Sequence, residues 1–368
     1  MTAIGRGVFL ALLVSVAALF PQRADETPHL RSSFAGMVAG LSERPGYFDT
    51  DNLVSNERSY LHVVPELRAL AGHHGRGVYL GVGPDQNFSY VAHLRPSLAI
   101  VIDIRRENLL LQLLFKALFA EAQTRVEYLA MLTGRPAPPL LADWKPRSIE
   151  AIVDYIDRTG PLRDADLRAT RARLSRVIDS FGVPLTDSDR ATIERFHRRF
   201  IGEGLALRFN TTGRPPQYDY PDFRGLLLEV DRHGTRRSYL ASEDDFQFVK
   251  RLQSEDRIVP IVGDLSGATA LAAVARLLSQ ANLEVAAFYT SNVEFYLFRD
   301  GRFADFIENL RRLPRLPGSL IVRSVFRSAD ASAARLPGYN SASLTQPIDT
   351  LVDGYARGRF RDYRDLTR

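Results

Sequence analysis

Residues 97–103 read Ser-Leu-Ala-Ile-Val-Ile-Asp, an apolar run that ends on the acidic residue Asp103. A strand that is apolar on both faces is typical of a parallel sheet covered by helices on both sides. Residues 78–82 predict a first strand of the same kind, and helices are expected over residues 88–94 and 106–132. Strand, helix, strand and helix in direct succession indicate a right-handed βαβ unit, so this stretch restricts the chain to the α/β class.

The rest of the chain divides into a helical part and a second set of strands. Residues from about 135 to 255 are charged and helical in their spacing, apart from a short strand expected over residues 225–230. Three more strands are expected over residues 258–264, 285–290 and 318–325, with helices over residues 268–280 and 303–313 between them. The sequence therefore predicts a doubly wound, mostly parallel, Rossmann-like sheet within residues 25–368, with a helical insertion at about 135–255.

The chain begins with a segment of a different kind. Residues 8–20 are apolar or small, with Arg6 before them and Pro21 after them. The run is shorter than the roughly 20 residues of a membrane-spanning helix, and a positive start before a short apolar run is typical of a secretory signal peptide. We expect residues 1–24 to be a signal peptide or N-terminal anchor, which predicts an exported (periplasmic) or membrane-anchored protein. The alternatives are a buried first helix or a misassigned start, and either would leave the protein cytoplasmic.

Composition excludes several classes of site. With no cysteine among its 368 residues, the chain has no disulfide, no cysteine-ligated zinc, no iron–sulfur cluster and no thiol nucleophile. The formal net charge is only +5 and the basic residues form no long run, so nucleic acid is not indicated as a partner. His73 and His74 lack a third ligand at a recognisable spacing, so no metal site is expected.

Glycines and polar residues stand where the expected strands end. Ligands of open α/β sheets bind outside the carboxyl ends of the strands, where glycines allow close approach and a carboxylate can accept ribose hydroxyls. Each residue alone is also typical of a turn or a helix cap, but their recurrence at successive strand ends favours one site for a small-molecule ligand. The candidates for binding a cofactor are Gly81, Gly83, Asp85, Asn87, Asp103, Asp264 and Leu265. We expect the strand ends bearing Gly81, Asp103 and Asp264 to meet at one pocket.

The glycine turn does not fit a dinucleotide. The G-x-G-x-x-G fingerprint requires a third glycine where Gln86 stands, and no G-x-x-x-x-G-K-[ST] sequence occurs. A nucleoside ligand without a pyrophosphate remains compatible with both observations.

The segments GVGPDQNFSY and VIDIRREN, with the acids and amides at the later strand ends, resemble class I S-adenosylmethionine-dependent methyltransferases and an uncharacterised bacterial family with that fold. The resemblance implies a transferase that uses S-adenosylmethionine on an unknown acceptor. It also implies that Asp103 holds the ribose, Asp264 lies near the adenine and Asn292 faces the substrate, which makes Asn292 the catalytic candidate. The sequence departs from the family at Tyr79, where an acid is usual, and at Asp85, where a third glycine is usual.

Residues 46–57 are polar for a segment that contains two aromatic residues, and they allow two interpretations. They could form a lid over the ligand in which Asn52, Asn56 and Glu57 contact the substrate, or an N-terminal wrap stabilised by Asx turns. The export signal also raises an alternative function. S-adenosylmethionine is a cytoplasmic metabolite, so an exported domain would instead be a non-catalytic or repurposed protein that binds a nucleoside-type ligand.

Overall fold

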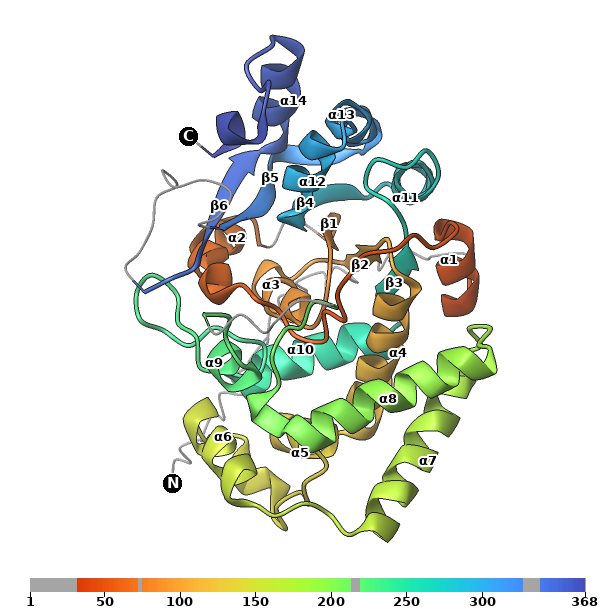
Figure 1. Ribbon diagram of the computed structural model, residues 1–368, viewed down its shortest axis with the longest axis vertical. Coiled ribbons are helices and arrows are strands. Elements are labelled where there is room, and N and C mark those ends of the chain that lie inside the picture. Colours follow the sequence, from red (N-terminus) through yellow and green to blue (C-terminus); the bar gives the residue numbers. More distant parts are fainter. Residues whose placement is uncertain (1–31, 72–74, 213–218, 327–337, 368) are drawn as a thin grey trace, which may run out of the picture.

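The computed structural model describes residues 32–71, 75–212, 219–326 and 338–367, and its centre is one six-stranded sheet (Figure 1). The strand order is β3-β2-β1-β4-β5-β6. Neighbouring strands are parallel except for β6, which pairs antiparallel with β5. The predicted α/β class and mostly parallel sheet are therefore confirmed. The strands are β1 (Gly77–Gly81), β2 (Leu98–Asp103), β3 (Ile258–Val262), β4 (Glu284–Ser291), β5 (Arg315–Phe326) and β6 (Ser341–Pro347).

The strand order reverses between β1 and β4. The chain passes from β1 outward through β2 to β3, and then returns to the other side of β1 to form β4 and β5. In such a sheet the crevice at the reversal, outside the carboxyl ends of the strands, is the usual ligand position. Because β1 and β3 both neighbour β2, their carboxyl ends are about 10 Å apart, which is two strand spacings.

Helices cover both faces of the sheet. The helices α3, α4 and α10 pack together on one face, whereas α1, α11, α13 and α14 are associated with the other. In the N-terminal part the helical segments are α1 (Phe34–Leu41), η1 (Arg58–Val63), α2 (Val64–Ala69), α3 (Gln86–Leu94), α4 (Arg106–Glu121) and α5 (Arg125–Thr133). Those of the C-terminal part are α11 (Ala270–Gln280), α12 (Val293–Arg299), α13 (Phe303–Arg312), α14 (Ile348–Ala356) and η4 (Tyr363–Leu366).

The insertion is helical, as expected. In Figure 1 its helices α6 to α8 lie below the strands, whereas α14 lies at the top of the view. Its helical segments are η2 (Leu141–Trp144), α6 (Ile149–Arg158), α7 (Asp164–Ser180), α8 (Asp187–Glu203), η3 (Gly204–Ala206), α9 (Phe223–Leu227) and α10 (Glu243–Ser254).

The long helix expected over residues 106–132 is two helices. α4 ends at Glu121 and α5 begins at Arg125. Thr124 is the reason for the break, because its side chain accepts a hydrogen bond from the Glu127 backbone N–H and so starts a new helix. The sequence did not indicate the break, because apolar residues continue at helical spacing on both sides of it.

The prediction of a strand over residues 225–230 is wrong. Residues 223–227 form the short helix α9, because the Asp222 carboxylate accepts a hydrogen bond from the Gly225 backbone N–H and caps it. β6, α12 and α14 were not predicted. β6 is an edge strand of mixed polarity, which gives a weak periodic signal.

The expected signal peptide or anchor lies in residues 1–24, outside the described residues. Over the described ranges, which begin at Ser32, no helix is both long enough and apolar enough to span a bilayer.

Candidate functional site at the carboxyl edge of the sheet

The glycine turn after β1 has the backbone shape that requires glycine at one position and the crowding that requires it at another. Gly83 has φ +86°, a left-handed conformation that side chains other than glycine rarely adopt. A Cβ at Gly81 would collide with the Asn87 amide oxygen and the Tyr79 hydroxyl. The space above Gly81 is therefore filled by this chain's own side chains, whereas Gly83 faces the Asn52 side chain, 3.3 Å from an ideal Cβ.

Asn87 fixes the turn. Its amide nitrogen donates to the carbonyl oxygens of Val82 (2.9 Å) and Pro84 (2.8 Å), and its oxygen accepts from the Tyr79 hydroxyl at 2.7 Å. Tyr79, which stands where the resemblance implies an acid, thus has a partner within the turn. Asn87 uses both amide hydrogens on the backbone, so its role in this structure is to hold the turn.

Asp103 at the end of β2 forms an ion pair with Arg105. Its Oδ1 accepts from the Arg105 backbone N–H (2.9 Å) and Nε (3.0 Å), and its Oδ2 accepts from Nη2 at 2.8 Å. Since an ionised carboxylate has about four acceptor positions, one remains for another donor. Arg105 is buried and also donates to the Thr50 carbonyl oxygen, while Arg106 pairs with Asp189 of the insertion. Both arginines therefore bind this chain's own groups.

Asp264, after β3, is held in a similar way. One carboxylate oxygen accepts from the backbone and side chain of Ser266 and the other from Arg302, at 2.6 Å. The neighbouring Leu265 is buried, and its carbonyl oxygen accepts from the Asn309 amide at 3.0 Å.

Residues 42–57, hereafter the covering segment, run along the carboxyl ends of the strands from β3 toward β5. At β3 the Glu43 carboxylate accepts from the backbone N–H groups of Asp264 (2.6 Å) and Ala270 (3.1 Å). At β2 the Gly46 backbone N–H donates to the Ile104 carbonyl oxygen at 2.8 Å. In Figure 1 this stretch is the orange-red chain between α1 and α2.

The covering segment ends at the reversal point with the buried side chain of Glu57. Its carboxylate accepts from Gln86 (3.1 Å) after β1, from Tyr289 (2.7 Å) and Ser291 on β4, and from Ser324 on β5. Glu57 is 1% exposed, and no cation of the described ranges pairs with it. A single side chain thus joins the ends of β4 and β5 to the start of α3, after β1, at the reversal of the strand order.

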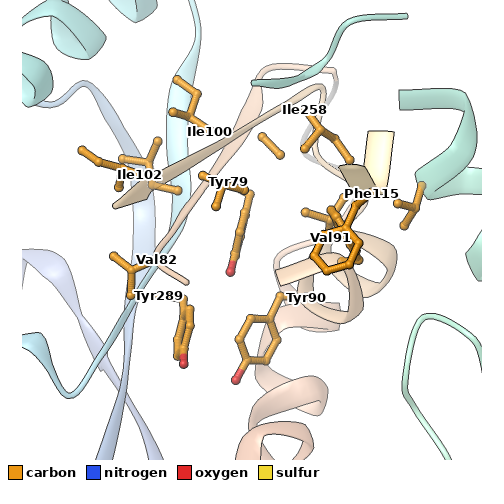
Figure 2. Close-up of a cluster of buried hydrophobic side chains, with 14 of the residues drawn as sticks. Tyr79, Val82, Tyr90, Val91, Ile100, Ile102, Phe115, Ile258 and Tyr289 are labelled. Atoms are coloured by element: carbon orange, nitrogen blue, oxygen red, sulfur yellow. The ribbon is translucent and has the colours of Figure 1, made fainter. Parts of the chain in front are cut away.

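A group of tyrosines surrounds this carboxylate. Figure 2 shows Tyr79, Tyr90 and Tyr289 with their hydroxyl groups directed to the same side, and the rings of Tyr90 and Tyr289 have their centroids 5.1 Å apart. Burial, and then nearby negative or phenolic charge, raises the pKa of each of the three hydroxyls well above 10. They therefore remain protonated, and those of Tyr79 and Tyr289 act as donors.

Asp85, the first residue before α3, is a second buried carboxyl beside the turn. Its Oδ2 accepts from the Tyr239 hydroxyl at 3.2 Å, and the residue as a whole is 5% exposed. Burial raises the pKa of Asp85 to about 7, with the hydrogen bond from Tyr239 acting in the opposite direction. Asp85 therefore changes charge near neutral pH inside the protein.

Three buried amide side chains, two on α4 and one directly after the glycine turn, have polar atoms without hydrogen-bond partners. Gln112 of α4 donates to the Gly83 carbonyl oxygen at 3.2 Å, but its own oxygen is unpaired. Asn108, one helical turn earlier and 2% exposed, has both its amide nitrogen and its oxygen unpaired. The oxygen of Gln86 in the turn is unpaired too. Buried polar groups are nearly always paired, so this group of atoms needs a water or a ligand.

The residues predicted from the sequence lie at the carboxyl edge of the sheet, but several of their side chains are already hydrogen-bonded within the protein. Asn52 lies beside Gly83, with φ +45°, and Asn56 is half-buried in the covering segment. Asn292 precedes α12 after β4 and is also half-buried. Sequence reasoning did not find Glu43, Asn108 and Gln112. Asn108 and Gln112 lie on α4, whose sequence is mostly apolar. Their spacing of four residues, which places both on one face of the helix, was the only sequence pattern that could have indicated them.

Comparison with known families matches residues 52–137 and 223–356, more than half of the chain, to a family described as a domain of unknown function (DUF7790). The chain belongs to this family. No curated protein matches the chain. The matched ranges contain all six strands, the glycine turn and the end of the covering segment at Glu57, and they leave out residues 138–222 of the insertion.

Proposed function

We propose that this member of the family binds S-adenosylmethionine, or a closely related adenosyl ligand, at the carboxyl edge of its sheet and acts as a methyltransferase-like protein. The observation that carries the proposal is the group of buried amides with unpaired atoms on α4, one of which, Gln112, donates to the Gly83 carbonyl oxygen near the reversal of the strand order. A nucleoside offers donors and acceptors to such groups, and the reversal is where ligands of doubly wound sheets bind.

The residues at this edge fit an adenosyl ligand with one restriction. Asp103 has one free acceptor position, so it can take one ribose hydroxyl while Arg105 stays in place. The ligand must lie over Gly83 rather than Gly81, where Tyr79 and Asn87 leave no room. Asn108 and Gln112 would then supply hydrogen bonds from α4, and Asn52 from the covering segment.

When bound, S-adenosylmethionine supplies an activated methyl group. This chain's contribution would be to position the two reactants, which is the main requirement of such a transfer. Asn292, after β4, is the residue that we assign to the acceptor side, together with Asn56 and Glu57 of the covering segment.

The alternative is a protein that binds a nucleoside-type ligand without chemistry, in accordance with the expected export signal. The observation that favours it is that the strand-end acids are already paired, Asp103 with Arg105 and Asp264 with Arg302. Glu57 is likewise enclosed by four donors from its own chain.

Two measurements separate these functions. Calorimetric titration of the full chain with S-adenosylhomocysteine tests the ligand, and no heat of binding up to about 1 mM would exclude both adenosyl functions. Incubation with methyl-labelled S-adenosylmethionine and an extract of the native host then tests the chemistry. We expect label to pass to the extract, and Asn292→Ala to reduce that transfer without abolishing binding. Binding without any transfer would favour the non-catalytic function.

A further inference from the structure

The insertion contains a cleft that none of the preceding roles uses. The helices α7 and α8 both pack on α4, and Figure 1 shows that they diverge from the short connection between them. A cleft of about 630 Å³ lies between the two helices. Its volume is within the range of about 300–1,000 Å³ that is usual for small-molecule sites.

The floor of the cleft is apolar. Leu114 of α4, Leu174 and Ile178 of α7, and Ile193 of α8 line it, and each is at most 7% exposed. His197 also lines the cleft, and burial lowers its pKa to about 4, so the imidazole is neutral at physiological pH. The floor therefore carries no charge and suits a hydrocarbon chain.

The rim of the cleft is cationic. The charged residues that line it are Arg168, Arg171, Arg190, Arg198, Asp187 and Glu194. Glu194 is shared between Arg198 (2.6 Å) and Arg171 (3.4 Å), and Arg190 pairs with Asp179. Arg168 has no ion-pair partner within the described part of the chain. The lining has two more cations than anions, which complements a negatively charged head group.

We propose that the cleft between α7 and α8 binds a single-chain amphiphilic anion, with the hydrocarbon chain on the floor and the carboxylate at the rim near Arg168. Arginine binds carboxylates through paired hydrogen bonds, and the apolar floor contributes the affinity that a surface arginine lacks. The cleft lies almost wholly in residues 138–222, which the family match leaves out. The proposal is therefore independent of the adenosyl site.

The test is calorimetric titration of the full chain with dodecanoate below its micelle concentration. We expect saturable binding, a loss of about tenfold in affinity when the chain is shortened by two carbons, and no comparable binding of dodecyltrimethylammonium. Arg168→Gln should weaken dodecanoate about three- to tenfold. Equal binding of the cationic amphiphile would overturn the proposal, because it would show a purely apolar surface.

Cleft-filling variants locate the site. Ala172→Trp on α7 and Ala191→Trp on α8 place an indole in the cleft from exposed positions, and Ala165→Trp on α7 lies outside the lining and is the matched control. We expect the first two to abolish dodecanoate binding at unchanged thermal stability, and the control to bind as the wild type does. Unchanged dodecanoate binding in all three variants would overturn the proposal. Absence of dodecanoate binding by the wild type would overturn it too, and would favour a second copy of this chain or its N-terminal segment as the occupant of the cleft.

Discussion

At the scale of single residues, the acid at the end of β2 is held by the residue two positions after it. The Asp103 carboxylate engages Arg105 through three hydrogen bonds, and the Arg105 side chain is 5% exposed. In this chain the acid at the end of an apolar strand therefore stabilises the fold. Because Asp103 stays paired with Arg105 in this structure, a ligand can bind only to its remaining acceptor position.

Asp103→Asn should destabilise the protein by about 3 kcal/mol, because it leaves the buried Arg105 guanidinium without a counter-charge. Urea unfolding measures the change, and the double variant Asp103→Asn with Arg105→Gln should recover much of it. A loss below about 0.5 kcal/mol in the single variant would mean that the pair contributes little.

Asp85 should make stability depend on pH. An unfolded aspartate titrates near 4, whereas the folded carboxyl titrates at about 7 because it is buried. Between these values the folded state keeps a proton that the unfolded state has lost, so stability falls as pH rises from about 4 to about 7. The loss is of the order of 4 kcal/mol.

Asp85→Asn removes that dependence, so the variant should exceed the wild type in stability at pH 8 and match it near pH 4. Urea unfolding across this range provides the measurement, with the exposed Asp305→Asn on α13 as a control that should follow the wild type. A wild type that gains stability on passing from pH 4 to pH 7 relative to Asp85→Asn would contradict the assignment.

At the scale of elements, the five parallel strands and the glycine turn were predictable, and the covering segment was predictable only as one of two alternatives. Apolar runs on both faces identify parallel strands because helices cover the sheet on each side. Side-chain partners across 29 to 267 positions, such as those of Glu57, leave no local pattern. The break between α4 and α5 depends on one threonine cap, and α9 on one aspartate cap, within otherwise continuous apolar spacing.

The covering segment should respond to a ligand at the edge that it covers. Hydrogen exchange of the full chain with and without S-adenosylhomocysteine should show a changed exchange rate at the backbone amides of residues 46–57, because the segment packs against Gly83 and the strand ends. The amides of α14, which packs on β5 and β6 and contacts none of the candidate site residues, should exchange as before. Ligand binding with no change in the segment would place the ligand elsewhere.

At the scale of the whole molecule, the sheet brings all the sequence-predicted strand-end residues to one edge, and the chain's own side chains occupy much of it. The fold class followed from local patterns. The pairing of each acid could not be predicted, since Arg105 and Arg302 are two of many arginines in an arginine-rich sequence. The unpaired amides of α4 are therefore the feature on which the proposed ligand site depends.

Asn108→Leu tests this distinction directly, with stability and binding measured on the same protein. Asn108 is buried without partners, so its replacement by an apolar residue should leave stability unchanged or raise it by about 1 kcal/mol. Calorimetric titration with S-adenosylhomocysteine should nevertheless show affinity reduced about tenfold or more. Gln253→Leu, at a buried amide next to the opposite edge of the sheet, should bind as the wild type does. Binding by Asn108→Leu that equals the wild type would contradict the account, because the amides beside Gly83 would then have no part in holding a ligand.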